Sequence, residues 1–175
     1  MKITTTHTTE RRSVLKYLAV FMSSVTLLPF SKISLAAATA LQKSKAEWRK
    51  LLPKESYEVL FEEDTEAPGS SALNTEKRKG TYICAACFLP LFDSAMKFDS
   101  GTGWPSFFDV LPGAIGTRKD NRLFITRTEY HCARCGGHQG HVFDDGPQPT
   151  GLRYCNNGVA LQFVSAEKEL PELRP

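Results

Sequence analysis

The chain has 175 residues, of which 41% are hydrophobic and 23% are charged, a composition that fits one globular domain with a processed leader. Its formal net charge is +3. Residues 1–40 hold five of the 22 basic residues and one of the 19 acidic residues, so 17 basic and 18 acidic residues remain after position 40. The near-neutral charge of residues 41–175 does not favour a protein that binds polyanions. We therefore expect no nucleic-acid partner, because nucleic-acid-binding domains usually carry a basic patch or stripe.

In residues 1–40, charged, uncharged and small residues follow one another as they do in a cleavable export signal. A pair of arginines beginning at Arg11 precedes an uncharged run over residues 17–31, and small residues follow. The run contains polar residues and is shorter than the roughly 20 residues that cross a bilayer as a helix, so a signal is favoured over a permanent membrane anchor. The paired arginines resemble a twin-arginine signal. We expect cleavage after Ala38 or Ala40, export to the periplasm and no stable membrane association after processing.

Residues 41–175 are expected to form a single domain that begins with two short helices. Ser44 and Glu47 form a capping-box pattern, and the apolar positions that follow predict a helix that ends before Pro53. A second helical segment is predicted over residues 54–62.

The rest of the domain is predicted to consist of short strands between turns. Residues 65–80 are rich in Pro, Gly, Ser and Asn without a period, which indicates a surface loop. No apolar period of helical length follows this loop. The predicted strands are 81–84, 95–98, 123–130, 153–155 and 159–164. The expected fold class is therefore mainly β, with antiparallel strands and short N-terminal helices.

Four of the five cysteines form two pairs with the same spacing, each near the end of a predicted strand. The pairs are Cys84 with Cys87 and Cys132 with Cys135. Two residues between thiolates let one tight turn present both sulfurs to one ion, and two such turns complete a tetrahedral site suited to zinc. Two disulfides, which an exported location favours, and redox-active pairs are the alternatives. The prediction is one structural Zn²⁺ per chain, because four sulfur ligands leave no open position for catalysis.

Cys155 is the remaining thiol, and it lies outside any metal-binding spacing. A free cysteine is commonly a small buried hydrophobe. Arg153, however, lies two residues away, which places it on the same face of the predicted strand. A cation near the sulfur lowers the pKa of a thiol and raises its thiolate fraction. Cys155 is therefore a candidate nucleophile, with inert burial as the alternative.

Two further segments carry side chains suited to chemistry. The glycine-rich segment 136–141 is predicted to be a flexible loop, and its residues His138 and His141 suit acid catalysis beside a thiolate. Trp104 follows two glycines on a predicted turn. Its ring is either a lid on the core or the apolar wall of a pocket for a small neutral group, such as a methyl thioether.

Three segments together resemble the methionine sulfoxide reductase B family in its zinc-containing, selenium-free form. The segments are 99–107, 138–147 and 153–157, and the resemblance covers roughly residues 55–165. It implies a fold of two antiparallel β sheets. It also implies an enzyme, a peptide-methionine (R)-S-oxide reductase that repairs methionine R-sulfoxide in oxidised proteins or peptides.

The resemblance implies a role for each matching residue. Cys155 attacks the sulfoxide sulfur, methionine leaves, and a sulfenic acid remains on the cysteine. His138 and His141 orient the sulfoxide and protonate its oxygen, while Arg153 helps hold the nucleophile as a thiolate. The other implied roles are a hydrogen bond in the site from Asn157, substrate contacts by Trp104 and Phe143, and zinc binding by Cys84, Cys87, Cys132 and Cys135.

Thr102 departs from the family pattern, because many members carry a second, resolving cysteine at this position. With four thiols committed to zinc, we predict that no internal disulfide forms in the normal cycle. An external reductant, either a thioredoxin-like or glutaredoxin-like protein or a small thiol, would then reduce the Cys155 sulfenic acid directly. We expect a monomer. The alternative functions are a zinc-stabilised β binding module with an inert Cys155, and a thiol-disulfide oxidoreductase that uses the paired cysteines.

Overall fold

The computed structural model describes residues 40–121 and 126–175. These residues all belong to one of the two units into which the chain divides. The export signal predicted for residues 1–40 lies outside the described residues, except for residue 40, and it stays a prediction. Residues 123–125 of one predicted strand also lie outside them, so that part of the strand stays a prediction. In the part of the chain described, no helix is long and apolar enough to cross a membrane.

The two N-terminal helices form where their sequence signals predict them. α1 (Lys45–Leu51) begins after Ser44, and both hydrogen bonds of the capping box are present. α2 (Lys54–Glu62) follows directly. The buried ring of Trp48 in α1 stacks on the ring of Phe61 in α2, with centroids 5.1 Å apart. Local capping starts the first helix, and this stacked pair fixes it against the second.

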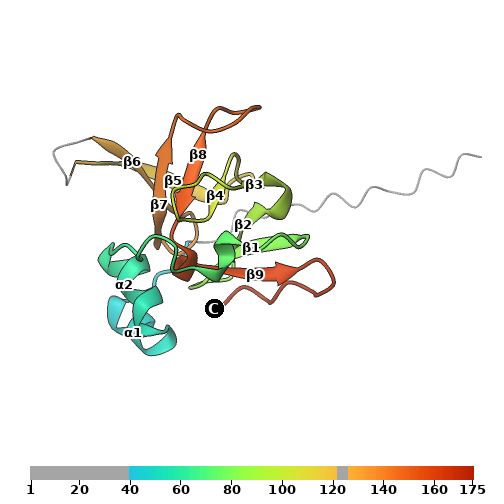
Figure 1. The fold of residues 1–175 in the computed structure, drawn as a ribbon. Helices are drawn as coiled ribbons and strands as arrows, with labels where there is room; N and C mark the ends of the chain where they lie inside the picture. The colour runs from blue at the N-terminus through green and yellow to red at the C-terminus, as the bar shows by residue number, and fades with distance from the viewer. Residues whose placement is uncertain (1–39, 122–125) are drawn as a thin grey trace, which may run out of the picture. The chain divides into compact units, whose positions relative to one another are not determined.

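Among the described residues, nine strands form two antiparallel sheets (Figure 1). The small sheet has the order β2-β1-β9, and the large sheet has the order β3-β4-β8-β7-β6-β5. The strands are β1 (Gly80–Cys84), β2 (Pro90–Asp93), β3 (Lys97–Phe98), β4 (Ser106–Phe107), β5 (Ile115–Asp120), β6 (Arg127–Cys132), β7 (His138–Phe143), β8 (Arg153–Asn156) and β9 (Leu161–Ser165). The expected fold class, two antiparallel sheets with short N-terminal helices, is confirmed.

Several local predictions were incomplete or wrong. The sequence pattern did not predict β2, β4, β5 or β7. Three short 3₁₀ helices also occur: η1 (Ala72–Asn74) in the predicted loop, and η2 (Ser94–Met96) and η3 (Gly158–Ala160) at the starts of two predicted strands.

The segment predicted to be a flexible histidine loop instead enters a central strand, β7. Gly140 in this strand explains the error. A Cβ atom there would lie 1.8 Å from the carbonyl oxygen of Cys155 on the neighbouring strand β8. This glycine therefore permits two backbones to approach closely, and it does not provide flexibility.

A cluster of buried aromatic rings joins the two sheets. Phe92 of β2 stacks on Phe107 of β4 with centroids 4.0 Å apart, and Tyr82 of β1 meets Phe107 edge-on at 4.9 Å. Tyr130 of β6 meets Phe92 edge-on at 6.3 Å. All four rings are fully buried. Because aromatic rings bury large areas in defined geometries, the cluster holds the sheets in one relative position.

The strand register places a row of polar side chains on one face of the large sheet. Directly opposed residues of antiparallel strands project to the same face. The opposed pairs join Ser106 to Cys155, Cys155 to His141, His141 to Glu129, and Glu129 to Arg118. The aromatic residues next to them in sequence point into the core. A thiol, an imidazole and a carboxylate from three separate strands therefore lie in one row on this face.

Candidate functional site

The two cysteine pairs lie on separate turns that have the same local backbone conformation. The amide of Phe88 donates to the carbonyl of Cys84, and the amide of Gly136 donates to the carbonyl of Cys132, both at 2.9 Å. Phe88 and Gly136 both have a positive φ, 64° and 72°. Each pair therefore sits on the same tight turn, one at the end of β1 and one at the end of β6.

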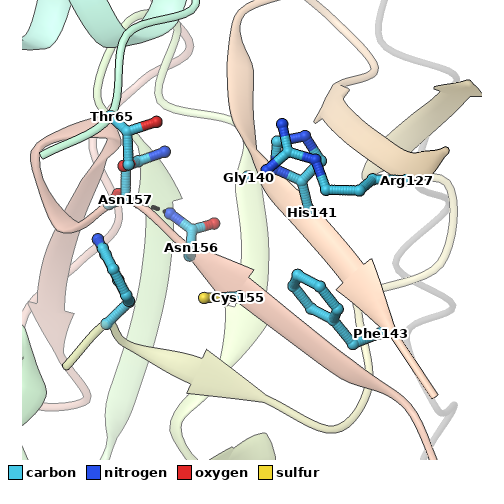
Figure 2. A pocket seen from close by; sticks show the side chains of 9 residues that line it. Thr65, Arg127, Gly140, His141, Phe143, Cys155, Asn156 and Asn157 are labelled. Carbon is cyan, nitrogen blue, oxygen red and sulfur yellow. Dashed lines mark hydrogen bonds between the residues drawn. The ribbon is translucent and has the colours of Figure 1, made fainter. Parts of the chain in front are cut away.

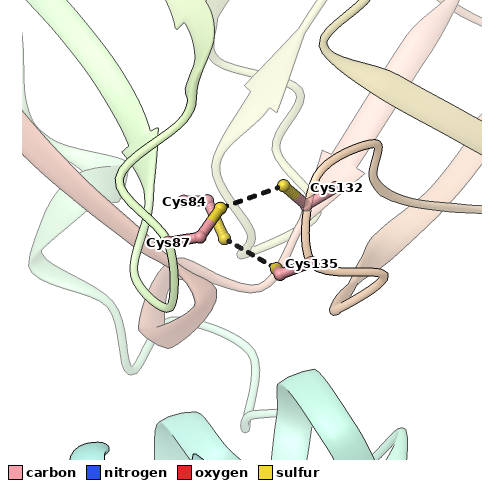
Figure 3. A group of neighbouring side chains, drawn as sticks. All are labelled: Cys84, Cys87, Cys132 and Cys135. Carbon is pink, nitrogen blue, oxygen red and sulfur yellow. Dashed lines mark hydrogen bonds between the residues drawn. The ribbon is translucent and has the colours of Figure 1, made fainter. Parts of the chain in front are cut away.

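The four sulfurs of these turns converge on one point (Figure 3). All lie within 4.8 Å of one another, with 3.7 Å between Cys84 and Cys135 and 3.5 Å between Cys87 and Cys132. A tetrahedral zinc site with Zn–S bonds of about 2.3 Å places its sulfurs about 3.8 Å apart, whereas a disulfide bond is about 2.05 Å long. The cluster can therefore hold one metal ion, and its donor set and spacing fit zinc.

A pocket lies over the polar row of the large sheet (Figure 2). Its lining contains five of the residues to which the sequence assigns a site role: Trp104, His141, Phe143, Cys155 and Asn157. Cys155 lies on β8, beside the strand that carries His141 and Phe143 (Figure 2). The structure thus brings the predicted nucleophile, one predicted acid and two aromatic rings into one cavity.

The surroundings of Cys155 favour its protonated thiol form. Burial raises the pKa of its thiol, and this effect outweighs Arg153 and Thr102, both of which lower it. The guanidinium of Arg153 forms a bidentate ion pair with the Asp145 carboxylate, with N–O distances of 2.7 and 2.8 Å. It also lies 4.3 Å from the ring centroid of Phe143. The prediction that Arg153 favours the thiolate has the right sign, but burial prevails because desolvation penalises the charged form.

His141 is held by a carboxylate at the edge of the pocket. Its Nε2 lies 2.8 Å from Oδ2 of Asp120, and the same oxygen accepts a hydrogen bond from Arg127 at 2.7 Å. Burial lowers the pKa of His141 below its ordinary value of 6.5; Arg127 also lowers it, and the bond to Asp120 raises it. At neutral pH the imidazole is therefore mostly neutral and can accept a proton.

Replacing Asp120 with asparagine is expected to lower the pKa of His141 further. The substitution removes both the hydrogen bond and the charge interaction by which this carboxylate raises the pKa of His141, while the Arg127 charge, which lowers that pKa, remains. An NMR titration of His141 measures the shift. Asp145→Asn is the matched control, because it removes a carboxylate that contacts Arg153. An unchanged or raised His141 pKa in Asp120→Asn would contradict this account.

His138 lies beside the pocket and is not part of its lining. It is 2% exposed, and its Nδ1 lies 2.8 Å from Oε1 of Glu129. Burial raises the pKa of Glu129, but hydrogen bonds from His131 and His138 lower it to about 2 overall. The His138 ring meets the His141 ring edge-on at 5.4 Å. The structure therefore separates the two predicted acids: one lines the cavity, and one packs against it.

Trp104 and Asn157 are both fixed by one stretch of the N-terminal loop. The indole Nε1 of Trp104 donates to the carbonyl of Glu66 at 3.1 Å, and the amide of Glu66 donates to Oδ1 of Asn157 at 3.1 Å. The Glu66 carboxylate also accepts from the amides of Gly158 and Val159, at 2.6 and 3.0 Å. Trp104 is therefore a wall of the pocket with its polar edge satisfied.

Some lining residues were not identified from the sequence: Thr65, Arg127, Gly140 and Asn156. Arg127 had a usable signal, because it alternates with Glu129 along a predicted strand and so shares its face. Thr65 had none, since it belongs to a loop without a period. Its place in the pocket depends on the path of the chain after α2.

Comparisons with known proteins agree with this geometry. The SelR domain family matches residues 52–165. A peptide methionine sulfoxide reductase MsrB of Methanosarcina barkeri is 50% identical over 75% of this chain and 94% of that protein. The MsrB proteins of Agrobacterium fabrum and Leifsonia xyli are 52% and 53% identical over 70% of this chain, covering 92% and 90% of their own lengths. The resemblance read from the sequence is confirmed, and the chain belongs to the SelR-domain family of MsrB peptide methionine sulfoxide reductases.

Proposed function

We propose that this chain reduces the R epimer of methionine sulfoxide in oxidised proteins, with Cys155 as the nucleophile and His141 as the proton carrier. The observation that carries the proposal is the strand register that opposes Cys155 to His141 inside the pocket. Trp104 and Phe143 supply apolar surface for the methyl thioether end of the substrate. The family relatives, whose names state peptide methionine sulfoxide reduction, support the reaction class.

The protonation states of the two residues suit the first step. The pKa of Cys155 is raised and that of His141 is lowered, so the resting pair is a thiol and a neutral imidazole. His141 accepts the thiol proton, and the thiolate attacks the sulfoxide. The imidazolium then returns the proton to the departing oxygen. The cysteine sulfur loses two electrons and becomes a sulfenic acid, while the substrate sulfur gains two and leaves as methionine.

The second half of the cycle requires a thiol from outside the chain. Thr102 occupies the neighbourhood of the Cys155 sulfur and offers a hydroxyl. The other four thiols converge in the metal cluster. An external thiol attacks the sulfenic acid, releases water and forms a mixed disulfide; a second thiol then frees Cys155 and leaves as the oxidised reductant. A thioredoxin-like or glutaredoxin-like protein or a small thiol supplies both equivalents.

We also propose that the metal in the four-cysteine cluster is one structural zinc ion per chain. Four thiolates complete its coordination, which leaves no position for substrate. Gln139 connects this cluster to the pocket: its Nε2 donates to the Cys84 sulfur at 3.5 Å, and its carbonyl accepts from the side chain of Asn157 at 3.1 Å. The ion would therefore support the pocket through the chain and take no part in the chemistry.

A single-turnover experiment without reductant tests the proposed function. A peptide containing methionine R-sulfoxide is mixed with the metal-loaded protein, and the intact protein mass is recorded afterwards. We expect one methionine per chain and one added oxygen on Cys155, with the S-sulfoxide peptide unchanged. No methionine and an unmodified Cys155 would favour the binding-module alternative. A disulfide between Cys155 and a cluster cysteine would refute the external reductant.

A further inference from the structure

Glu66 uses each of its polar groups to hold one side of the pocket. Its carbonyl accepts a hydrogen bond from the indole of Trp104, and its amide donates to Oδ1 of Asn157, both at 3.1 Å. Its two carboxylate oxygens accept from the consecutive amides of Gly158 and Val159, at 2.6 and 3.0 Å. The carboxylate therefore anchors the residue, and the backbone of the same residue holds two side chains that line the pocket.

The amide of Glu66 also decides which way round the Asn157 carboxamide lies. Oδ1 of Asn157 accepts from this amide, and Nδ2 donates to the carbonyl of Gln139 at 3.1 Å. In the flipped orientation an NH2 group would face the Glu66 amide and an oxygen would face the Gln139 carbonyl, so both bonds would be lost. The carboxamide nitrogen carries a second hydrogen. Because Asn157 lines the pocket, this hydrogen is what it can offer to a substrate oxygen.

The turn that carries Trp104 is held by other residues of the N-terminal loop. The amide of Gly69 and Nδ2 of Asn74 both donate to the carbonyl of Gly103, at 2.7 and 2.9 Å. A Cβ atom on Gly103 would lie 2.9 Å from the loop, so the two segments pack closely. These contacts place the backbone of the turn, whereas the bond to Glu66 orients the ring.

Asn157 lies across the pocket from the proposed proton carrier. Figure 2 shows Asn157 on one side of Cys155 and His141 on the other. None of the four hydrogen bonds described for Glu66 goes to Cys155 or His141. Glu66 thus holds a wall of the pocket, while the thiol and the imidazole are held by other elements.

We propose that Glu66 is a positioning residue that places Trp104 and Asn157 and thereby sets the fit of the methionine sulfoxide side chain in the pocket. The carboxylate is the anchor because it offers one oxygen to each of two amides, whereas a glutamine carboxamide would turn an NH2 group toward one of them. Loss of this anchor should weaken substrate binding more than it slows the chemistry. The role rests on the proposed function, but the position of Trp104 can be measured without substrate.

Glu66→Gln, which keeps the shape of the side chain, should raise KM for an R-sulfoxide peptide about tenfold and leave kcat within about threefold, because a charge-assisted bond is lost from the wall. Steady-state assays of the metal-loaded protein with a thiol reductant measure both constants. Glu76→Gln is the matched control. Glu76 belongs to the same loop and accepts from the amide of Arg78 at 2.9 Å, and its replacement should change neither constant. Unchanged constants in a folded Glu66→Gln protein, or a loss confined to kcat, would overturn the proposal.

Acrylamide quenching of tryptophan fluorescence reports the position of the ring without substrate. The chain has two tryptophans, and Trp48 is 1% exposed, so added quenching comes from Trp104. Glu66→Gln should increase the quenching, since the carbonyl that holds the indole is no longer anchored, and Glu76→Gln should not. Equal quenching in Glu66→Gln and the unaltered protein is incompatible with the proposed role.

A double-mutant cycle with Trp104→Phe shows whether Glu66 acts through the ring. Phenylalanine keeps an aromatic wall but has no N–H for the Glu66 carbonyl. The rise in KM caused by Glu66→Gln should therefore be smaller in this background, and full multiplication of the two effects would overturn the proposal.

Metal content and thermal unfolding show that each variant is folded. If Glu66→Gln does not fold, Glu66→Asp, which keeps both oxygens on a shorter stem, replaces it in all three measurements with the same expected directions. If the unaltered protein reduces no sulfoxide while the quenching difference appears, the proposed function is wrong and the placement of Trp104 by Glu66 stands.

Discussion

Cys155→Ser is expected to lower the rate of methionine sulfoxide reduction by at least about a thousandfold. Two properties of sulfur are lost together. A serine hydroxyl is far less acidic than a thiol, so His141 cannot generate its anion. An oxygen nucleophile that received the sulfoxide oxygen would also have to form a peroxide, whereas a sulfur forms a sulfenic acid. Steady-state assays with an R-sulfoxide peptide and a thiol reductant measure the change.

The matched control for this loss is metal content. Cys155 lies outside the four-cysteine cluster, so the serine protein should retain one ion per chain and unfold at close to the original temperature. Activity above about a tenth of the original in a folded, metal-loaded Cys155→Ser protein is incompatible with Cys155 as the nucleophile.

Cys132→Ser is expected to remove the metal and, with it, most of the stability of the domain. Cys132 ends β6 in the large sheet, and Cys84 ends β1 in the small one. A metal ion held by the four cysteines would therefore join the two sheets. Structural zinc sites contribute on the order of 10 kcal/mol, which is comparable to the whole stability of a typical domain, about 5–15 kcal/mol.

Metal analysis and thermal unfolding test this second prediction together. The expected result is less than one ion per chain and a lost or strongly lowered cooperative transition, which a strong chelator should reproduce in the unaltered protein. Cys155→Ser is again the matched control, since it removes one thiol and spares the cluster. A Cys132→Ser protein that unfolds like the original would show that the aromatic cluster alone holds the sheets together.

The parts of the molecule that could be predicted from the sequence are local in origin. The capping box at Ser44 predicts α1 because its donors and acceptors lie within one turn. The equal spacing of the cysteine pairs predicts the metal cluster because each tight turn presents two sulfurs by itself. Cys155 was identifiable as the thiol left over by that spacing. Each of these inferences needs only neighbouring residues or a repeated interval.

Strand prediction failed where glycine and polar residues occupy a central strand for tertiary reasons. The local sequence of β7, taken alone, predicts a flexible loop. In the folded chain, Gly140 lets the backbone of β8 approach closely, and the buried His138 has a hydrogen-bond partner in the Glu129 carboxylate, 2.8 Å from its Nδ1. Propensity describes an isolated segment, and it does not include the strand or the carboxylate that packs against it.

The sequence by itself determined the family, the four cysteines that cluster, the nucleophile candidate and the class of fold, because these depend on residue type and spacing. Only the tertiary structure decided that His141 faces Cys155 while His138 lies outside the pocket lining. It also decided that burial outweighs Arg153 in setting the pKa of Cys155. Strand register and desolvation both depend on residues that are distant in sequence. For this reason neither could be predicted from the local sequence around Cys155 and His141.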